Sequence, residues 1–258
     1  MISVIGLTAA ALALICLLGW WWQCRTRNAG HADVIWIFGL GATALVYLLV
    51  GEGRWLPRLI AGLLVLAWSL RLGWHVARRV FSEAHEDGRY QAMREAMGTR
   101  INLFHFFFFQ GQGLLAWLFA LPFAAIGANT TSASPAWLCA GALVGGIALV
   151  GEALADRQLA NWRADPAHRG YTCRRGLWRY SRHPNYFFEW LHWFSYPLLA
   201  AGSPWQGWLW LAPVLMLVFL WFVTGIPYTE RQALKTRGED YREYQRTTSP
   251  FIPWRPKC

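Results

Sequence analysis

The chain has 258 residues, of which 55% are hydrophobic and only 15% are charged, with a formal net charge of +10. A soluble domain carries about 25% charged residues, so this composition argues against a water-soluble enzyme, and it excludes disorder, whose signature is low hydrophobicity. Basic loops between long apolar segments are typical of a membrane protein rather than of a nucleic-acid-binding one. We therefore expect an integral membrane protein in contact with lipid, with no nucleic acid partner.

Seven segments are apolar and long enough to cross a membrane, for which about 20 residues are needed. The first has no basic residue before its apolar run and no cleavage site of small residues, so we predict a retained span rather than a signal peptide. The fold class predicted is all-α, a polytopic membrane protein with seven transmembrane helices in a single domain over residues 1–258. The spans are 2–23, 34–50, 57–77, 102–126, 136–156, 186–202 and 206–227.

Lys and Arg are divided very unevenly between the two sides of this predicted bundle. The side reached after the first span holds 21 of the 24 basic residues, the other side holds only Arg54 and Arg58, and Arg71 lies within the third span. Basic loops face the cytoplasm. The N-terminus is therefore predicted outside and the C-terminus in the cytoplasm.

The five cysteines indicate no special chemistry. Their number is odd, they are scattered, and no CxxC pair occurs among them. Neither a disulfide framework nor a metal site is expected from that pattern.

Ionisable residues inside the predicted spans are candidates for function, because a charge in hydrocarbon is costly. Arg71 is equally compatible with a functional role and with snorkelling or an ion pair between helices. Glu152 and Asp156 lie four residues apart on one face of the fifth span, and Arg163 lies seven further on. Like charges at that spacing repel, so this pair predicts a shared cationic or hydroxyl-rich partner. The glycines of the same span, including Gly151, indicate close helix packing.

The segment before the sixth span is the densest in basic and aromatic residues. Residues 171–186 contain four Arg, one His and three Tyr. A helix is predicted to begin near Pro184, and its free N–H groups together with the Arg cluster form an anion site. A loop that binds lipid head groups is the alternative. Asn185 and Glu189, one turn apart at the start of the span, favour a ligand that reaches inward.

The C-terminal tail has a similar composition. Glu230 and Arg231 follow the last span, and residues 238–253 are rich in aromatic residues and proline. A merely solvated tail does not require them. We predict that this tail folds back over the cytoplasmic mouth of the bundle.

The run Leu-Trp-Arg-Tyr-Ser-Arg-His-Pro-Asn-Tyr-Phe-x-Glu-Trp at residues 177–190 resembles the membrane steroid 5α-reductase family (3-oxo-5α-steroid 4-dehydrogenase), in its bacterial branch. The resemblance covers most of the chain from the third span onward. Arg-His-Pro-x-Tyr alone is also similar to isoprenylcysteine and phospholipid methyltransferases, and sterol reductases are related. Further motifs that carry the resemblance are Trp68-Ser-Leu-Arg71-Leu, 86–90, Phe109-Gln110-Gly111, Glu152-x3-Asp156-x6-Arg163 and the tail 238–253.

What the resemblance implies is an oxidoreductase that binds NADPH from the cytoplasm, in the bacterial inner membrane. It would reduce the Δ4 double bond of a 3-oxo-steroid, or of a similar lipid-soluble enone, by hydride transfer to C5 and protonation at C4. An Arg surplus beside two acids suits the 2′-phosphate of NADPH. The cofactor contacts implied by position are Arg71, Arg89, Asp156, Arg163, Tyr180, Asn185 and Glu189, and local context adds Glu152, Arg182, His183 and Arg231.

The group that donates a hydrogen bond to the substrate carbonyl is less well matched. In the family a Glu at the end of the second helix and a Tyr in the third look like this donor; Glu52 matches the first and must be protonated, as a desolvated carboxyl is. The family's Gln before it is Gly51 here, and its Tyr aligns nearest Trp68, whose indole cannot exchange a proton usefully. The catalytic candidates are Glu52, Trp68 and, as a fallback, His75.

Two other functions stay open at this level. One is a membrane methyltransferase that uses S-adenosylmethionine at the same Arg-His-Pro-x-Tyr turn. The other is a lipid-binding or transport scaffold, which predicts no tight dinucleotide binding; transporters often show internal repeats or paired broken helices, and the sequence shows neither.

Overall fold

The computed structural model describes residues 1–82, 86–223 and 225–257. Helices make up 81% of it, and the described residues contain no strand, which confirms the all-α prediction. The chain divides into two compact units. The first comprises Met1–Pro135 and Leu199–Gln206, and the second comprises Ala136–Leu198 and Gly207–Cys258.

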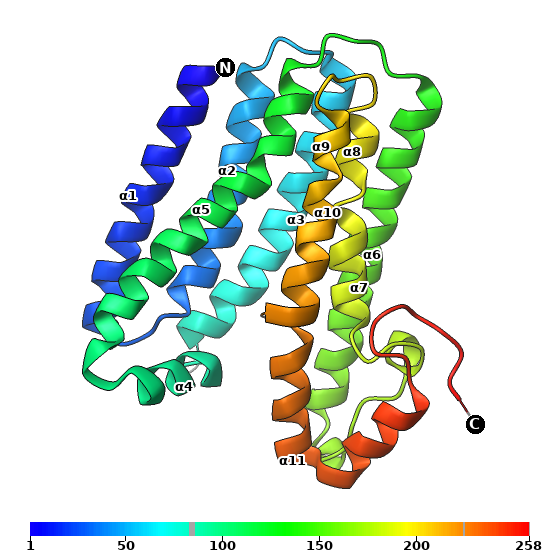
Figure 1. The fold of residues 1–258 in the computed structure, drawn as a ribbon. Helices are drawn as coiled ribbons and strands as arrows, with labels where there is room; N and C mark the ends of the chain where they lie inside the picture. The colour runs from blue at the N-terminus through cyan, green and yellow to red at the C-terminus, as the bar shows by residue number, and fades with distance from the viewer. Residues whose placement is uncertain (83–85, 224, 258) are drawn as a thin grey trace. The chain divides into compact units, whose positions relative to one another are not determined.

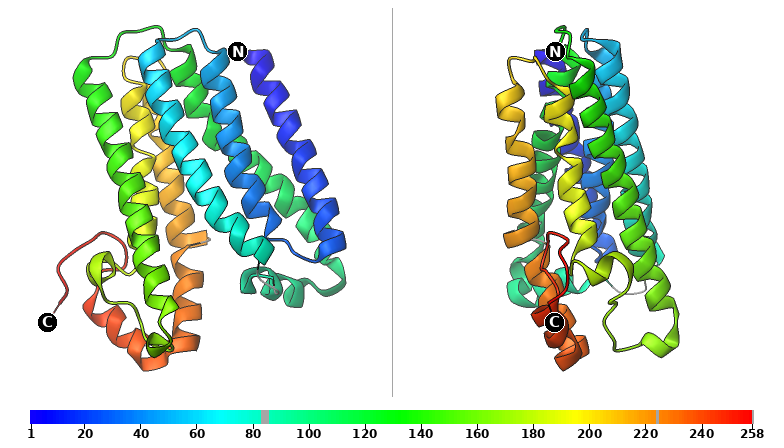
Figure 2. Two further views of the ribbon diagram at one scale, coloured as in Figure 1. Left: turned by 180° about the vertical axis from the view of Figure 1, so that it is seen from behind. Right: turned by 90° about the vertical axis from the view of Figure 1, so that its right-hand side faces the viewer.

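Four long helices build the first unit (Figures 1 and 2). Helix α2 packs against α1, α3 and α5, and α1 also packs against α5. A short helix, α4, and a 3₁₀ turn precede α5. The bounds are α1 Ile2–Thr26, α2 His31–Val50, α3 Trp55–Ser82, α4 Gly88–Met97, η1 Gly98–Arg100 and α5 Ile101–Ala128.

The turn between α2 and α3 packs directly on the end of α5, backbone against backbone. The Gly53 amide donates a hydrogen bond to the Gly127 carbonyl at 2.7 Å. A Cβ atom on Gly51 would overlap that same carbonyl group. The contact therefore requires residue 51 to lack a side chain, which gives a physical reason for the departure from the family pattern at this position.

The second unit contains one long helix, α6, and a series of shorter ones (Figure 1). Its α6 and α7 pack closely, because a Cβ on Gly151 would overlap the ring of Phe188. This confirms the packing role predicted for Gly151, whereas Gly146 has no atom within 4 Å of such a Cβ. The bounds are α6 Pro135–Ala164, η2 Pro166–His168, η3 Gly176–Arg179, α7 Pro184–His192, α8 Ser195–Leu199, α9 Gln206–Leu209, α10 Leu211–Val218, η4 Phe219–Val223 and α11 Ile226–Thr247.

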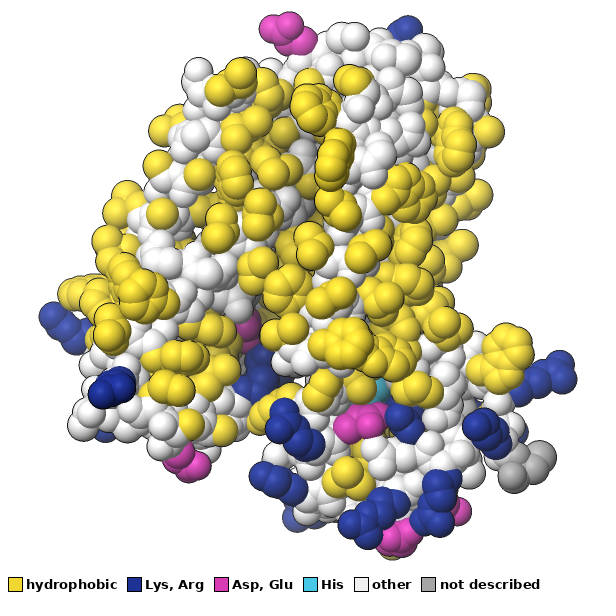
Figure 3. Space-filling model, viewed as in Figure 1, with side chains coloured by type: hydrophobic (Ala, Val, Ile, Leu, Met, Phe, Trp, Pro, Cys, Tyr) yellow, Lys and Arg dark blue, Asp and Glu magenta, His cyan; other side chains and the backbone are white. Residues whose placement is uncertain are grey.

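The structure is that of an integral membrane protein. Among the described residues, six helical stretches are long and apolar enough to cross a membrane. Large apolar side chains on them are exposed, such as Leu7, Phe107 and Leu143, each more than half exposed. Hydrophobic side chains cover the long helices in Figure 3, while Lys and Arg gather near one end of each unit. The six stretches are Ile2–Thr26, His31–Val50, Trp55–Ser82, Gly88–Ala128, Pro135–Ala164 and Gln206–Thr247.

The predicted span 186–202 is not one helix. It is broken between α7 and α8 by a turn at residues 193–194. The predicted span 206–227 is built from α9, α10 and the π-helical turn η4, and residue 224 within it lies outside the described residues.

Candidate functional site

The loop that precedes α7 is ordered by its own side chains. Pro184 is the first residue of α7, as predicted, where a fixed φ and a missing N–H cost nothing. The Ser181 hydroxyl accepts a hydrogen bond from the His183 amide at 3.1 Å and donates one to the Phe251 carbonyl at 2.7 Å. The start of α7 is thus tied to the tail of the chain.

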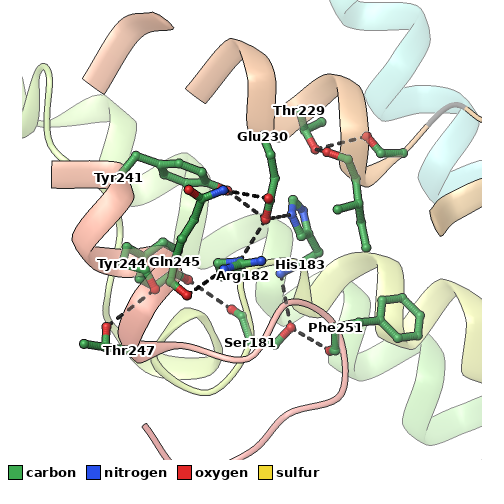
Figure 4. Close-up of polar contacts among 12 residues, drawn as sticks. Ser181, Arg182, His183, Thr229, Glu230, Tyr241, Tyr244, Gln245, Thr247 and Phe251 are labelled. Atoms are coloured by element: carbon green, nitrogen blue, oxygen red, sulfur yellow. Dashed lines mark hydrogen bonds and ion pairs between the residues drawn. The ribbon is translucent and has the colours of Figure 1, made fainter. Parts of the chain in front are cut away.

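A carboxylate from α11, Glu230, holds this loop (Figure 4). Its Oε1 lies 2.8 Å from Arg182 Nε and 3.2 Å from His183 Nε2, while its Oε2 accepts a hydrogen bond from Gln245 at 2.7 Å. Burial alone would raise the pKa of Glu230, but the hydrogen bond from His183 and the charge of Arg182 outweigh it and lower that pKa. Burial also lowers the pKa of His183, against the opposing pull of Glu230.

Helix α11 reverses direction at Gly238, and this turn completes the Glu230 cluster. Gly238 has φ 53° and ψ −121°, a conformation that only glycine adopts readily. The second half of the helix returns toward the first, so that Tyr241 and Gln245 point at Glu230 (Figure 4). A residue with a side chain at 238 would strain the turn that places them.

The tail packs back on the loop, as predicted. The Arg182 amide donates to the Ser249 carbonyl at 2.9 Å, and the Trp254 amide donates to the Tyr180 carbonyl at 2.9 Å. Phe251 lies among aromatic rings, 5.5 Å from Trp190 between ring centroids. The loop before α7 is therefore fixed by a segment that follows it by about 70 residues.

Helices α6 and α7 bring together the acids and the amide that the sequence singled out. Asn185 donates a hydrogen bond from Nδ2 to Asp156 Oδ1 at 3.3 Å. Its Oδ1 is buried and has no hydrogen-bond partner among the described residues. Glu189, only 7% exposed, accepts a hydrogen bond from Trp193 Nε1 at 3.1 Å. Glu152 on α6 is also buried.

Three guanidinium groups lie around Cys173, on the segment between α6 and α7. Burial raises the pKa of this thiol, and the charges of Arg175, Arg163 and Arg237 act in the opposite direction. Arg175 also lies over the ring of Trp162, 5.3 Å from its centroid. These residues come from α6, the loop and α11, and they form a basic cluster within the second unit.

In the first unit, Arg89 takes part in a network of ion pairs. Its guanidinium lies 2.8 Å from Asp33 and 3.1 Å from Asp87. Burial would raise the pKa of Asp87, but the charge of Arg89 and the hydrogen bonds it makes lower it. Arg94 pairs with Glu86 at 2.7 Å in the same region. The charge of Arg89 is thus already balanced by acids of its own unit.

The remaining predicted site residues lie in different surroundings. Glu52 is exposed in the turn after α2, and His75 is exposed on α3. Trp68 is fully buried in the first unit, against Trp36. Arg71 on α3 is half-buried, and Arg163, Tyr180 and Arg231 are exposed.

Two buried residues in the second unit escaped the sequence argument. His192 and Tyr196 are 1% and 0% exposed, and they hydrogen-bond to each other at 2.5 Å. The spacing of His192 from Asn185 and Glu189 was a usable signal, since it continues the same face of α7, whereas Tyr196 lies beyond the break. Glu230 offered no such signal, because its partners lie far away in the sequence.

Comparison with known proteins places this architecture in a family. The profile of a family described as "Protein of unknown function (DUF1295)" matches residues 19–248. An uncharacterized protein of Schizosaccharomyces pombe is 28% identical over 265 aligned residues, which cover 91% of this chain and 75% of the yeast protein. No solved structure matches significantly. The chain belongs to the DUF1295 family, which is related in general to steroid 5α-reductase-like membrane proteins.

Proposed function

We propose that the protein is an NADPH-dependent reductase of a carbon–carbon double bond conjugated to a ketone, in a lipid-soluble substrate such as a 3-oxo-Δ4 steroid. The general relationship of the DUF1295 family to steroid 5α-reductase-like membrane proteins supports this class of activity. The observation that carries the proposal is the order of polar groups in the second unit. An exposed basic cluster is followed by the Asn185–Asp156 contact and then by buried Glu189 on α7.

The basic residues of the second unit fit the phosphate groups of a dinucleotide cofactor. Guanidinium groups at Arg163, Arg175 and Arg237 suit phosphate oxygens, which they bind through paired N–H donors. The buried Oδ1 of Asn185 has no hydrogen-bond partner within the described part of the chain, and it can accept a hydrogen bond from a carboxamide such as that of nicotinamide. When bound, this cofactor supplies a hydride, while the protein supplies orientation and electrostatics.

The protein's own task is to stabilise the charge that hydride addition creates. Addition at C5 places negative charge on the C3 oxygen, and a hydrogen-bond donor must face that oxygen. Glu52, Trp68 and His75 stay predictions for this role.

We further propose that the broken segment α7–α8 completes a set of seven crossings, with the N-terminus outside and the C-terminus in the cytoplasm of a bacterial inner membrane. Under this topology the exposed Cys139, near the start of α6, faces outward. A membrane-impermeant maleimide should then label Cys139 in intact cells and leave Cys24 unlabelled. Labelling of Cys24 instead would invert the topology.

Direct binding to the detergent-solubilised protein tests the function. We expect NADPH to bind at least about tenfold more tightly than NADH, as an additional charge-assisted contact would give. Arg163→Ala and Arg175→Ala should weaken NADPH binding more than NADH binding, while Arg255→Ala, an exposed control in the tail, should change neither. Equal affinity for the two dinucleotides contradicts the phosphate assignment. Binding of S-adenosylmethionine in place of either would favour the methyltransferase.

A further inference from the structure

The break between α7 and α8 carries a buried polar cluster that the proposed cofactor site does not use. The Trp193 and Phe194 amides bond to Trp190 and Leu191, three residues back, so the helix tightens and ends. The Ser195 hydroxyl donates to the His192 carbonyl at 2.7 Å, which satisfies an acceptor freed by the break. Non-helical backbone at membrane depth is tolerated only where protein buries it or where it lines a polar cavity.

The side chains at this break form an acid–base pair. Tyr196 OH and His192 Nε2 are 2.5 Å apart, and their rings meet edge to face with centroids 5.2 Å apart. Both side chains are buried, Tyr196 completely. A phenol and an imidazole in direct contact can exchange a proton, because a histidine can both accept and return one near neutral pH.

The pair also extends the polar face of α7. Asn185, Glu189 and His192 follow one another at intervals of four and three residues on α7, the spacing of one helical face, and Tyr196, beyond the break, is joined to this face by its hydrogen bond to His192. Glu189 is held by Trp193, the first residue of the break. The polar groups at this end of the second unit thus extend from the Asn185–Asp156 contact past Glu189 to His192 and Tyr196.

We propose that Tyr196, backed by His192, donates the hydrogen bond and the proton to the carbonyl oxygen of the substrate. This inference rests on the proposed reductase function and names the acid that function requires. It places the acid in the same unit as the proposed cofactor residues.

The proton and electron changes balance as follows. Two electrons and one hydrogen enter the β-carbon of the enone as hydride, the double bond shifts, and the carbonyl oxygen takes up the negative charge. Tyr196 O–H passes its proton to that oxygen, and the resulting enol becomes the saturated ketone by exchanging a proton between oxygen and the α-carbon. His192 returns a proton to the Tyr196 phenolate, and the one proton consumed in each turnover comes ultimately from water. The sum is one hydride and one proton added, with the dinucleotide oxidised.

A test without cofactor uses a fluorescent steroid analogue with a naphthol ring, whose ionised form mimics the enolate oxygen. Tyr196→Phe keeps the ring and removes the hydroxyl. It should weaken binding of the ionised naphthol by at least about tenfold, in line with the loss of an oxyanion donor. Tyr171→Phe, on an exposed tyrosine, is the matched control and should bind normally. Thermal unfolding in detergent reports whether each variant folds, and His192→Gln provides a second variant with a smaller expected loss.

The second arm measures single-turnover NADPH oxidation with a 3-oxo-Δ4 steroid. Tyr196→Phe should slow it by about 10²–10³-fold with unchanged NADPH affinity. Wild-type rates and wild-type naphthol binding in Tyr196→Phe would overturn the assignment of Tyr196 and leave the reductase function intact. Failure of the wild-type protein to bind NADPH would instead overturn the proposed function, and the naphthol experiment would still decide whether Tyr196 serves as an oxyanion donor.

Discussion

The Arg89 network of the first unit and the Glu230 cluster of the second contain the same kinds of side chain in different proportions. Around Arg89, three arginines are paired with three acids, namely Arg79, Arg89 and Arg94 with Asp33, Glu86 and Asp87. In the second unit Glu230 contacts both Arg182 and His183, and Arg174 pairs with Asp240 and Glu243, while Arg175 and Arg237 lie over the rings of Trp162 and Tyr241.

We propose that this difference distinguishes a network that stabilises the fold from a cluster that binds a ligand. A balanced set of ion pairs satisfies its own charges and ties α2 to the segment that leads into α4. A guanidinium group that lies over an aromatic ring keeps its positive charge and would still attract an anion. Counting arginines along the sequence does not distinguish the two situations, because the acids that neutralise a given arginine come from other elements.

Replacement of Glu189, which lies on the face that we propose to bind the cofactor, should have the largest effect on turnover. Glu189→Ala should abolish reduction, with turnover at least about 10²-fold below wild type, because a precisely placed polar contact to the reacting end is lost. The protein should still fold in detergent. The measurement is NADPH oxidation with an enone substrate, alongside thermal unfolding. Near-normal turnover would remove Glu189 from the site.

Glu230→Ala should strongly destabilise the second unit. It leaves the mostly buried Arg182 and His183 without their carboxylate, and breaking a buried pair costs about 3–5 kcal/mol, less here because Glu230 retains 16% exposure. We expect a loss of about 2–3 kcal/mol in unfolding free energy. Glu230→Gln, which keeps a hydrogen-bond acceptor, should lose less. Equal losses for the two variants would show that charge is unimportant in this cluster.

Two glycines with the same backbone conformation give a matched comparison between the units. Gly98 has φ 51° and ψ −123°, Gly238 has φ 53° and ψ −121°, and a Cβ at either position meets no atom within 4 Å. Alanine at each should cost about 1–3 kcal/mol of backbone strain. Gly238→Ala should cost more, because it also displaces Tyr241 and Gln245 from Glu230. Equal shifts in melting temperature would mean that the turn does not support the cluster.

Arg89→Ala tests whether Arg89 stabilises the fold of the first unit or binds the cofactor. It removes a guanidinium group that is 24% exposed and pairs with both Asp33 and Asp87, so we expect a loss of stability of about 1–2 kcal/mol. NADPH affinity should change by less than about twofold, which is below 0.5 kcal/mol. A loss of affinity of about tenfold without loss of stability would instead make Arg89 a cofactor ligand, as the family resemblance implied.

Acid should weaken the Glu230 cluster gradually. The folded-state pKa values of His183 and Glu230 both lie below their ordinary values of 6.5 and 4.5. The unfolded chain therefore binds more protons than the folded chain. These two groups contribute their full stability only above their ordinary pKa values, and this contribution is lost as the pH falls, first through His183 and then through Glu230. Melting temperatures between pH 7.5 and 5 measure the first part. His183→Gln should flatten this dependence, and an unchanged slope in that variant would assign it to other groups.

Local rules explain what could be predicted from the sequence. Runs of apolar residues located the long helices, and Pro184 marked the start of α7. The spacing of Asn185 and Glu189 placed them on one helix, since the period of 3.6 residues depends only on neighbours along the chain. The return of the tail to the loop was predicted from composition alone.

Contacts between distant residues decided the rest. Glu230 meets His183 across 47 positions, and no local pattern connects the two. Gly51 is explained only by the Gly127 carbonyl that faces it, and the break at residues 193–194 interrupts a segment whose hydropathy predicted one span. Hydropathy measures how well a segment tolerates hydrocarbon, whereas a helix break depends on whether nearby groups satisfy the freed backbone. The sequence by itself therefore determined which segments are helical and membrane-embedded, and the tertiary structure decided which charges are neutralised and where the polar face of α7 and α8 ends.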